Sequence, residues 1–98
     1  MGQYLVQITL PEYLDEEFLA LIPEQRAYAD TLMGQGIIAS YSLAMDRSTL
    51  WVVFNSTNEK NVVSAIDNFP IADYIDYEVV ELAFHNSSSV VFPNLSLN

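Results

Sequence analysis

Residues 37–55, IIASYSLAMDRSTLWVVFN, contain two apolar runs separated by the polar triplet Asp46-Arg47-Ser48. A short polar segment between two runs with β-branched and aromatic residues is typical of a β-hairpin. We therefore predict strands over 37–45 and 49–55, joined by a turn at 46–48. This hairpin decides the fold, because one strand and one helix are predicted on each side of it.

The segment before the hairpin reads as a strand and then a helix. Residues 3–10 (QYLVQITL) alternate between apolar and polar positions, which predicts a strand. Asp15 is a suitable N-cap for a helix whose first turn is acidic. Pro23 predicts either a kink in that helix or the first residue of a second helical segment. Gly34 and Gly36 predict its end.

The segment after the hairpin has the opposite order, a helix and then a strand. Ser56 and Glu59 have the spacing of a capping box, which predicts a helix over 57–68. Pro70 interrupts the helical pattern, and residues 75–85 (IDYEVVELAFH) predict a fourth strand. The order β-α-β-β-α-β predicts an α+β, ferredoxin-like domain with a four-stranded antiparallel sheet.

We expect this domain to occupy residues 1–86 and a C-terminal tail to occupy 87–98. The tail is polar at first and then carries apolar residues, among them Val90, Val91 and Phe92. A disordered tail has no need of such groups, so we predict that it packs on a neighbouring subunit. A frayed chain end is the alternative.

Composition excludes several classes of function. The formal net charge is −10, and the only basic residues are Arg26, Arg47 and Lys60. Three scattered cations cannot grip a phosphate backbone or an anionic membrane surface, so we predict neither nucleic-acid nor membrane binding. The chain has no cysteine and one histidine, which argues against thiolate sites, and we predict no metal and no cofactor. No secretory signal or membrane span is visible, so we expect a cytoplasmic protein.

The predicted sheet has two apolar faces, although helices cover only one. Hydrophobic residues make up 51% of the chain and charged residues only 16%, against a typical charged share of about 25%. To the helix-covered face we assign Tyr4, Val6, Ile8, Tyr41, Leu43, Leu50, Val52, Phe54, Val80, Leu82 and Phe84. To the opposite, open face we assign Leu5, Gln7, Thr9, Ile38, Ser40, Ser42, Trp51, Val53, Tyr77, Val79, Glu81 and His85.

An apolar open face predicts a homodimer or a higher homo-oligomer, in which a second copy covers it. Two sheets face to face would enclose either a chamber for a small apolar or aromatic ligand or an interface filled by side chains.

Candidate site residues follow from this assignment. Glu81 would be desolvated between sheets, and a carboxylate with a raised pKa suits proton abstraction beside a carbonyl; an ion pair in the interface is the alternative. His85 is a second candidate base, and an exposed or capping histidine, which its place before a polar tail favours, is the alternative.

The candidates for ligand binding are polar and aromatic residues of the strands. Gln7, Ser40 and Ser42 would orient a ligand, and Trp51 and Tyr77, together with Tyr41, would form an aromatic wall, unless these rings are simple core.

From Pro23 onward, several short motifs occur in a characteristic order. They are Ala27-Tyr28, Gly36, Val53-Phe54, Ser56, Tyr74, Tyr77-Glu78-Val79, Leu82, His85 and Ser87-Ser88. In these motifs the chain resembles the muconolactone isomerase family of the dimeric α/β-barrel group. The resemblance implies a ferredoxin-like subunit in a homo-oligomer, often a large ring. It also implies a cofactor-free isomerase that shifts a double bond in an unsaturated lactone acid.

The second predicted strand departs from this family. It reads IASYSL over 38–43, where the family carries basic and aromatic residues. A carboxylate in a dry pocket needs a cation, and only Arg47 in the turn and Arg26 on the first helix are candidates. YciI-like proteins are a more distant resemblance, but Gln25 and Phe69 stand where their acid–base pair is expected. A non-catalytic ligand-binding or assembly protein is therefore one alternative, and a cofactor-free monooxygenase-like or heme-handling barrel is another.

Overall fold

The predicted order of elements is confirmed in the computed structural model, which describes residues 2–86. The elements are β1 (Gly2–Thr9), α1 (Glu16–Gly34), β2 (Ile38–Leu43), β3 (Thr49–Ser56), α2 (Glu59–Asp67), the 3-10 helix η1 (Ala72–Tyr74) and β4 (Asp76–Leu82). The predicted role of the tail, 87–98, concerns residues outside this range. No helix in the described range is long and apolar enough to cross a membrane.

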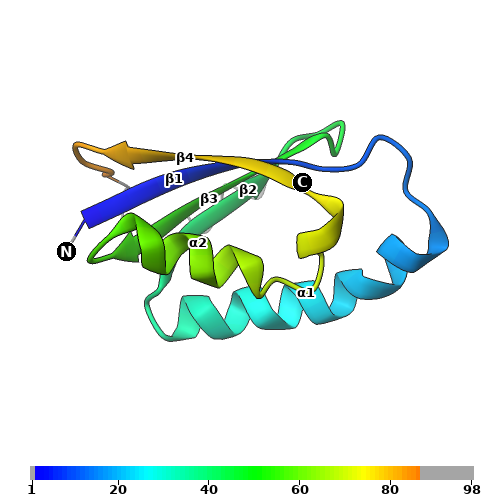
Figure 1. The fold of residues 1–98 in the computed structure, drawn as a ribbon, viewed down its shortest axis with the longest axis horizontal. Helices are drawn as coiled ribbons and strands as arrows, with labels where there is room; N and C mark the ends of the chain where they lie inside the picture. Colours follow the sequence, from blue (N-terminus) through cyan, green and yellow to red (C-terminus); the bar gives the residue numbers. More distant parts are fainter. Residues whose placement is uncertain (1, 87–98) are drawn as a thin grey trace, which may run out of the picture.

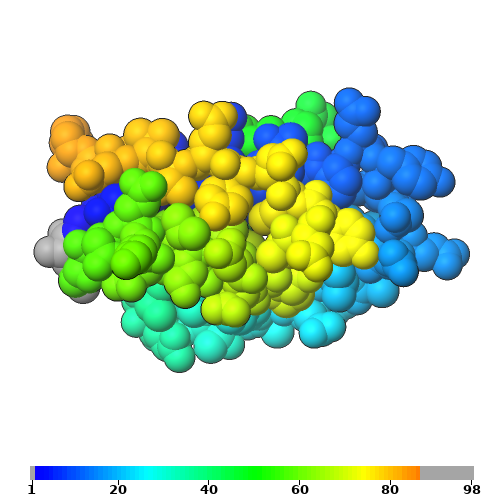
Figure 2. All heavy atoms as spheres, in the orientation of Figure 1, coloured from blue at the N-terminus to red at the C-terminus, as the bar shows by residue number. Residues whose placement is uncertain are grey.

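The four strands form one antiparallel sheet in the order β2-β3-β1-β4. Both helices lie on the same face of the sheet, with β2 and β4 at its two edges (Figure 1). In the space-filling view, α2 and the residues after it fill the front, and the segment that joins β1 to α1 closes one end (Figure 2). The α+β, ferredoxin-like prediction is confirmed.

Helix α1 begins and ends as its sequence predicts. The Asp15 carboxylate accepts a hydrogen bond of 2.8 Å from the Phe18 amide, which satisfies one of the unpaired donors of the first turn. The helix continues through Pro23, so no second helical segment begins there. Gly36 has a φ of 77°, and the amide of Ile37 donates to the Leu32 carbonyl, an arrangement that glycine allows without a steric clash.

Helix α2 is capped differently from the prediction. Ser56 ends strand β3 instead of capping the helix, and its hydroxyl donates to the Asn58 carbonyl at 2.7 Å. Asn58 is the N-cap, because its side-chain oxygen accepts from the Asn61 amide at 2.9 Å. The predicted capping box was therefore wrong, and the helix begins at Glu59. Ser56 and Asn58 lie two positions apart and have similar capping ability, which makes such a shift easy.

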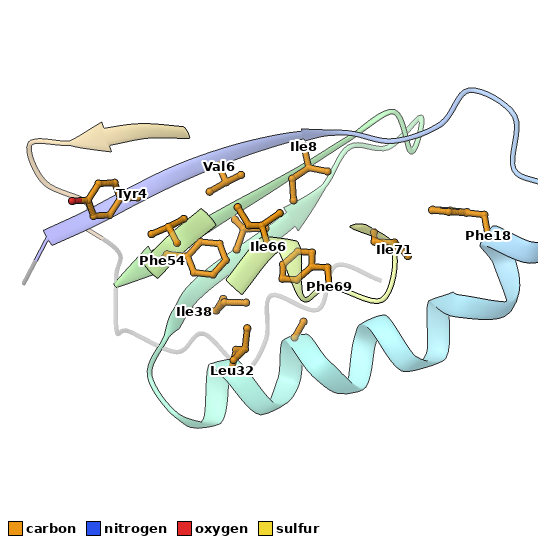
Figure 3. Packing of buried hydrophobic residues seen from close by; sticks show 13 residues of the cluster. Tyr4, Val6, Ile8, Phe18, Leu32, Ile38, Phe54, Ile66, Phe69 and Ile71 are labelled. Carbon is orange, nitrogen blue, oxygen red and sulfur yellow. The ribbon is translucent and has the colours of Figure 1, made fainter. Parts of the chain in front are cut away.

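The core lies between the helix-covered face of the sheet and the helices (Figure 3). Its largest fully buried side chains are Phe54, Ile8, Ile66, Ile71, Val6, Val52 and Val62. They come from the two central strands, from α2 and from the segment after α2. Tyr28 of α1 meets Phe69 edge to face, with ring centroids 5.6 Å apart, which joins α1 to the segment after α2.

The prediction for the faces of β4 was wrong. In the register with β1, Ile8 pairs with Tyr77, Val6 with Val79 and Tyr4 with Glu81. Paired residues of antiparallel strands share a face, so the β4 members of these pairs lie on the helix-covered face. Val80 and Leu82, which pair with Leu5 and Gln3, lie on the open face instead. Alternation along a strand defines two sets of residues, but a shift of one residue exchanges their faces.

Three further assignments are corrected. Ile38 was predicted on the open face, but it pairs with Phe54 and is buried in the core, and an irregularity between Ile38 and Ser40 accounts for the change. Phe84 and His85 follow the last residue of β4, so neither belongs to a strand face. The predicted strand over 75–85 is thus shorter at its end.

We expect Ile66→Ala to lower the free energy of unfolding by about 2–5 kcal/mol, because it leaves a cavity at the centre of the core. Urea denaturation measures this change. Met45→Ala is the control, since Met45 is 97% exposed and its loss should change stability by less than about 0.5 kcal/mol. Equal unfolding midpoints for the two variants would contradict this account of the core.

Candidate functional site

A pocket of about 600 Å³ lies between α1 and the β2–β3 half of the sheet. It is on the helix-covered side, opposite the open face. Twelve of its sixteen lining residues are apolar: Leu10, Leu14, Phe18, Leu19, Ile22, Ala29, Ile38, Leu43, Leu50, Val52, Phe69 and Ile71. Its volume and its mostly apolar wall are those of a small-molecule site.

The pocket exists because the helices fill the space above the sheet unevenly. The segment after α2 carries Phe69 and Ile71 into the centre of the core. At the outer edge, Tyr41 and Leu43 of β2 point to the helix side but are 40% and 46% exposed. Side chains of α1 therefore do not close the space over the outer half of β2, and a hollow is left between them.

Four polar residues interrupt the apolar wall: Gln25 and Arg26 of α1, Tyr41 of β2, and Arg47 of the β2–β3 turn. Two of the three basic residues of a chain with net charge −10 therefore line one pocket. No aspartate, glutamate or histidine is among the described lining residues. The pocket is suited to a ligand that is apolar in its body and anionic at one end.

Tyr41 is held at the pocket by a carboxylate of α1. Its hydroxyl donates a hydrogen bond of 3.2 Å to Asp30 Oδ1. The pKa of Tyr41 is raised above its usual value, first by partial burial and then by the negative charge and hydrogen bond of Asp30, while Arg26 lowers it. Tyr41 is therefore protonated at neutral pH. Its oxygen can accept a proton from a ligand only if its own proton moves to another group at the same time.

Gln25 offers a hydrogen-bond donor to the pocket. Its side chain is 7% exposed, and Oε1 accepts from the Ile71 amide at 3.4 Å. Because a buried amide needs an acceptor, this bond fixes which end of the side chain faces the protein. The side-chain NH₂ is then the group that Gln25 can present to a ligand.

The turn that carries Arg47 is held by local bonds. The carboxylate of Asp46 accepts from the amide and from the hydroxyl of Ser48, at 2.9 Å and 2.7 Å. The hydrogen bond from the Ser48 hydroxyl, followed by that from its amide, lowers the pKa of Asp46 below its usual value. Arg47 itself has a φ of 64°, in the left-handed region.

The predicted ligand-binding residues divide between the two faces. Arg26 lines the pocket, as noted. Gln7, Trp51 and Ser42 lie in one row across the open face, and Trp51 Nε1 donates to Gln7 Oε1 at 3.3 Å. Ser40 pairs with Val53 in the next row of the same face. The structure brings these four together, but on the other side of the sheet from the pocket.

The predicted bases lie away from the pocket. Glu81 is on β4, at the opposite edge of the sheet from β2, and its charge raises the pKa of Tyr4 in addition to the larger effect of burial. His85 follows that strand. Tyr77 packs against the core, where burial and then Asp67 raise its pKa. No group of three or more potential metal ligands occurs within residues 2–86.

Two pocket residues, Gln25 and Leu43, were not selected from the sequence, and neither was Asp30, which holds Tyr41. A signal for the helical part was present: Phe18, Ile22, Gln25 and Ala29 recur at helical spacing and define one side of α1. Gln25 is the polar residue in this otherwise apolar stripe, and a polar residue at such a position is a candidate for ligand binding. No comparable pattern indicated that Leu43 would be left half-exposed.

The comparisons with known proteins agree with this architecture. A profile of muconolactone delta-isomerase matches residues 3–88. The chain belongs to the muconolactone delta-isomerase family. A comparison with curated protein sequences gives no match.

Two solved structures share the fold. A crystal structure of muconolactone isomerase superposes with a TM-score of 0.71 at 22% identity, over 92% of this chain and 97% of that one. The 5-chloro-2-hydroxyhydroquinone dehydrochlorinase of Burkholderia phenoliruptrix AC1100, in complex with 2,5-dihydroxybenzoquinone, also has a TM-score of 0.71, at 13% identity. This match covers 85% of the present chain and 95% of the dehydrochlorinase. At these identities the likeness concerns the fold.

We expect Asp30→Asn to lower the pKa of Tyr41 towards its usual value, because the substitution removes a negative charge and a charged acceptor. Arg26→Gln should raise that pKa further. NMR titration of protein labelled with ¹³C at the tyrosine ring measures both changes. Tyr74, whose pKa is raised by burial and by Glu17, is the internal control and should not respond. Equal Tyr41 titrations in all three proteins would exclude this arrangement.

Proposed function

We propose that this protein is a cofactor-free isomerase for a small unsaturated lactone acid or a related carboxylate, bound in the pocket between α1 and β2. The observation that carries the proposal is the presence of Arg26 and Arg47 on the wall of a mostly apolar pocket. Membership of the muconolactone delta-isomerase family supports the reaction class. The proposed position replaces the chamber between sheets that the sequence suggested.

The two arginines supply the positive charge that strand β2 lacks. A carboxylate that leaves water for an apolar pocket needs a charged partner, because an unpaired buried anion is costly. Strand β2 supplies no cation, but α1 and the β2–β3 turn supply one each. A guanidinium can donate two parallel hydrogen bonds to a carboxylate, which fixes the orientation of the ligand as well as its charge.

The proposed chemistry uses Tyr41 and Asp30. A double-bond shift removes a proton from one carbon and returns a proton to another. As the carbon loses its proton to the Tyr41 oxygen, the Tyr41 proton passes along the existing hydrogen bond to Asp30. The electron pair of the broken C–H bond moves into the conjugated carbonyl, and the reverse transfers deliver the proton to the second carbon. Asp30 is the net acceptor of the proton, and Arg26 pairs with the carboxylate of the ligand.

Glu81 and His85 remain candidate bases only in an assembly that brings β4 of one copy to the pocket of another. A non-catalytic ligand-binding protein is the second candidate function. It is favoured by the lack of a carboxylate or imidazole among the described lining residues.

We expect Tyr41→Phe to lower kcat on muconolactone by about a hundredfold or more, because it removes the relay but not the arginines. Arg26→Gln should mainly raise KM. Absorbance of the conjugated lactone follows turnover, and Ser42→Ala, on the open face, is the matched control. Full kcat in Tyr41→Phe would remove Tyr41 from the mechanism. Arg26-dependent binding without any turnover would favour the binding protein.

We also propose that two copies associate through their open sheet faces. This face carries Leu5, Val53 and Val80 in one row, and Val80 is 52% exposed in the single chain. Val53 is buried, but the half-exposed Val80 beside Leu5 leaves apolar surface in this row that a second copy would cover.

Val80→Glu should therefore shift the protein towards monomer in sedimentation velocity, because it places a charge in that row. Met45→Glu makes the same change of charge at an exposed turn residue and should leave the assembly intact. A wild-type protein that sediments as a monomer at micromolar concentration would refute the association.

A further inference from the structure

We infer that the pocket takes an amphiphilic monocarboxylate with an aliphatic or fused-ring body, larger than a compact lactone acid. This inference rests on the proposed function for the position of the site and for the anionic end of the ligand. The new part concerns the rest of the ligand. The volume of the pocket indicates its size, and the distribution of apolar wall residues indicates that it is apolar.

The pocket is larger than a compact lactone acid requires. Pockets of about 300–1,000 Å³ are typical for drug-sized ligands, and this one measures about 600 Å³. A lactone acid built on a five-membered ring would leave much of that space to water. Water next to twelve apolar side chains makes few favourable interactions. A hydrocarbon body that replaces this water lowers the free energy of binding with every methylene.

The apolar wall is continuous from the opening of the pocket to the core. It runs from Leu14, Leu19 and Leu43, which are 39%, 48% and 46% exposed, inwards to side chains of the core such as Phe69. Three half-exposed leucines around one opening are unfavourable in water unless a ligand covers them. A compact ligand held at the arginines could not cover both this rim and the interior.

The backbone of Arg47 also points to a bound anion. It is the only non-glycine residue within the described range with a positive φ, 64°. An L-residue with a β-carbon is disfavoured there, and glycine would relax the turn. A strained residue on the wall of a pocket indicates that its side chain is kept for what it contacts. We assign that contact to the carboxylate of the ligand.

The test is a chain-length series of straight-chain carboxylates from hexanoate to dodecanoate, each below its micelle concentration. Displacement of a pocket-bound fluorescent probe, 1-anilinonaphthalene-8-sulfonate, gives the affinities. We expect the affinity to rise about fourfold per methylene until the pocket is full. Alkan-1-ols of the same length should bind roughly tenfold more weakly or worse, because they cannot pair with the arginines.

Arg47→Gly separates binding from stability. It should leave the thermal midpoint unchanged or higher, because glycine tolerates this φ. It should also weaken decanoate binding roughly tenfold or more and leave decan-1-ol unaffected. Lys60→Gln removes the same charge from the exposed face of α2 and is the matched control, with unchanged affinities expected.

The outcomes distinguish this inference from the proposed function. Affinities that do not rise with chain length, with muconolactone turnover intact, would overturn the ligand class and leave the isomerase proposal standing. Affinities that rise and depend on Arg47, without lactone turnover, would support the ligand class and refute the isomerase. Binding that is indifferent to Arg47 would overturn the inference in either case.

Discussion

The packing of α2 and the segment after it against β1 and β3 is the interaction on which the rest of this structure depends. Ile66, Phe54 and Ile8 are almost completely buried there, and Phe69 continues the contact towards α1 (Figure 3). With the centre of the sheet filled in this way, α1 has only the β2 side left to cover. It covers that side incompletely, and the hollow that remains is the pocket.

Charge makes this hollow more than a packing defect. The protein has thirteen acidic residues, yet the described pocket wall has none and has two arginines. Outside the pocket, thirteen acidic residues face a single basic one, Lys60, so an anion is attracted to the pocket more than to the rest of the protein. The apolar wall strengthens the same interaction by excluding water. The position of the site and the anionic, apolar character of its ligand thus both follow from two arginines on an apolar wall.

The sequence predicted the elements better than their faces. The hairpin, the Asp15 cap and the glycine at the end of α1 depend on neighbouring residues, and all three were predicted correctly. The capping of α2 was assigned to Ser56 instead of Asn58, since both can accept the same kind of bond. For β4, alternation separated Tyr77 and Val79 from Val80 correctly but gave each set the wrong face. Arg26 was selected as a ligand-binding residue, whereas Gln25 and Asp30 were not.

The order of apolar and polar residues determined an α+β subunit with two helices on one side of four strands. The composition determined the scarcity of cations. Only the tertiary structure decided which face each residue of β4 occupies, that the hollow lies under α1 and not on the open face, and that Arg26 and Arg47 share it. The physical reason is the range of the interactions. Caps, turns and alternation act over a few residues, whereas register and cavities arise where segments distant in the chain meet.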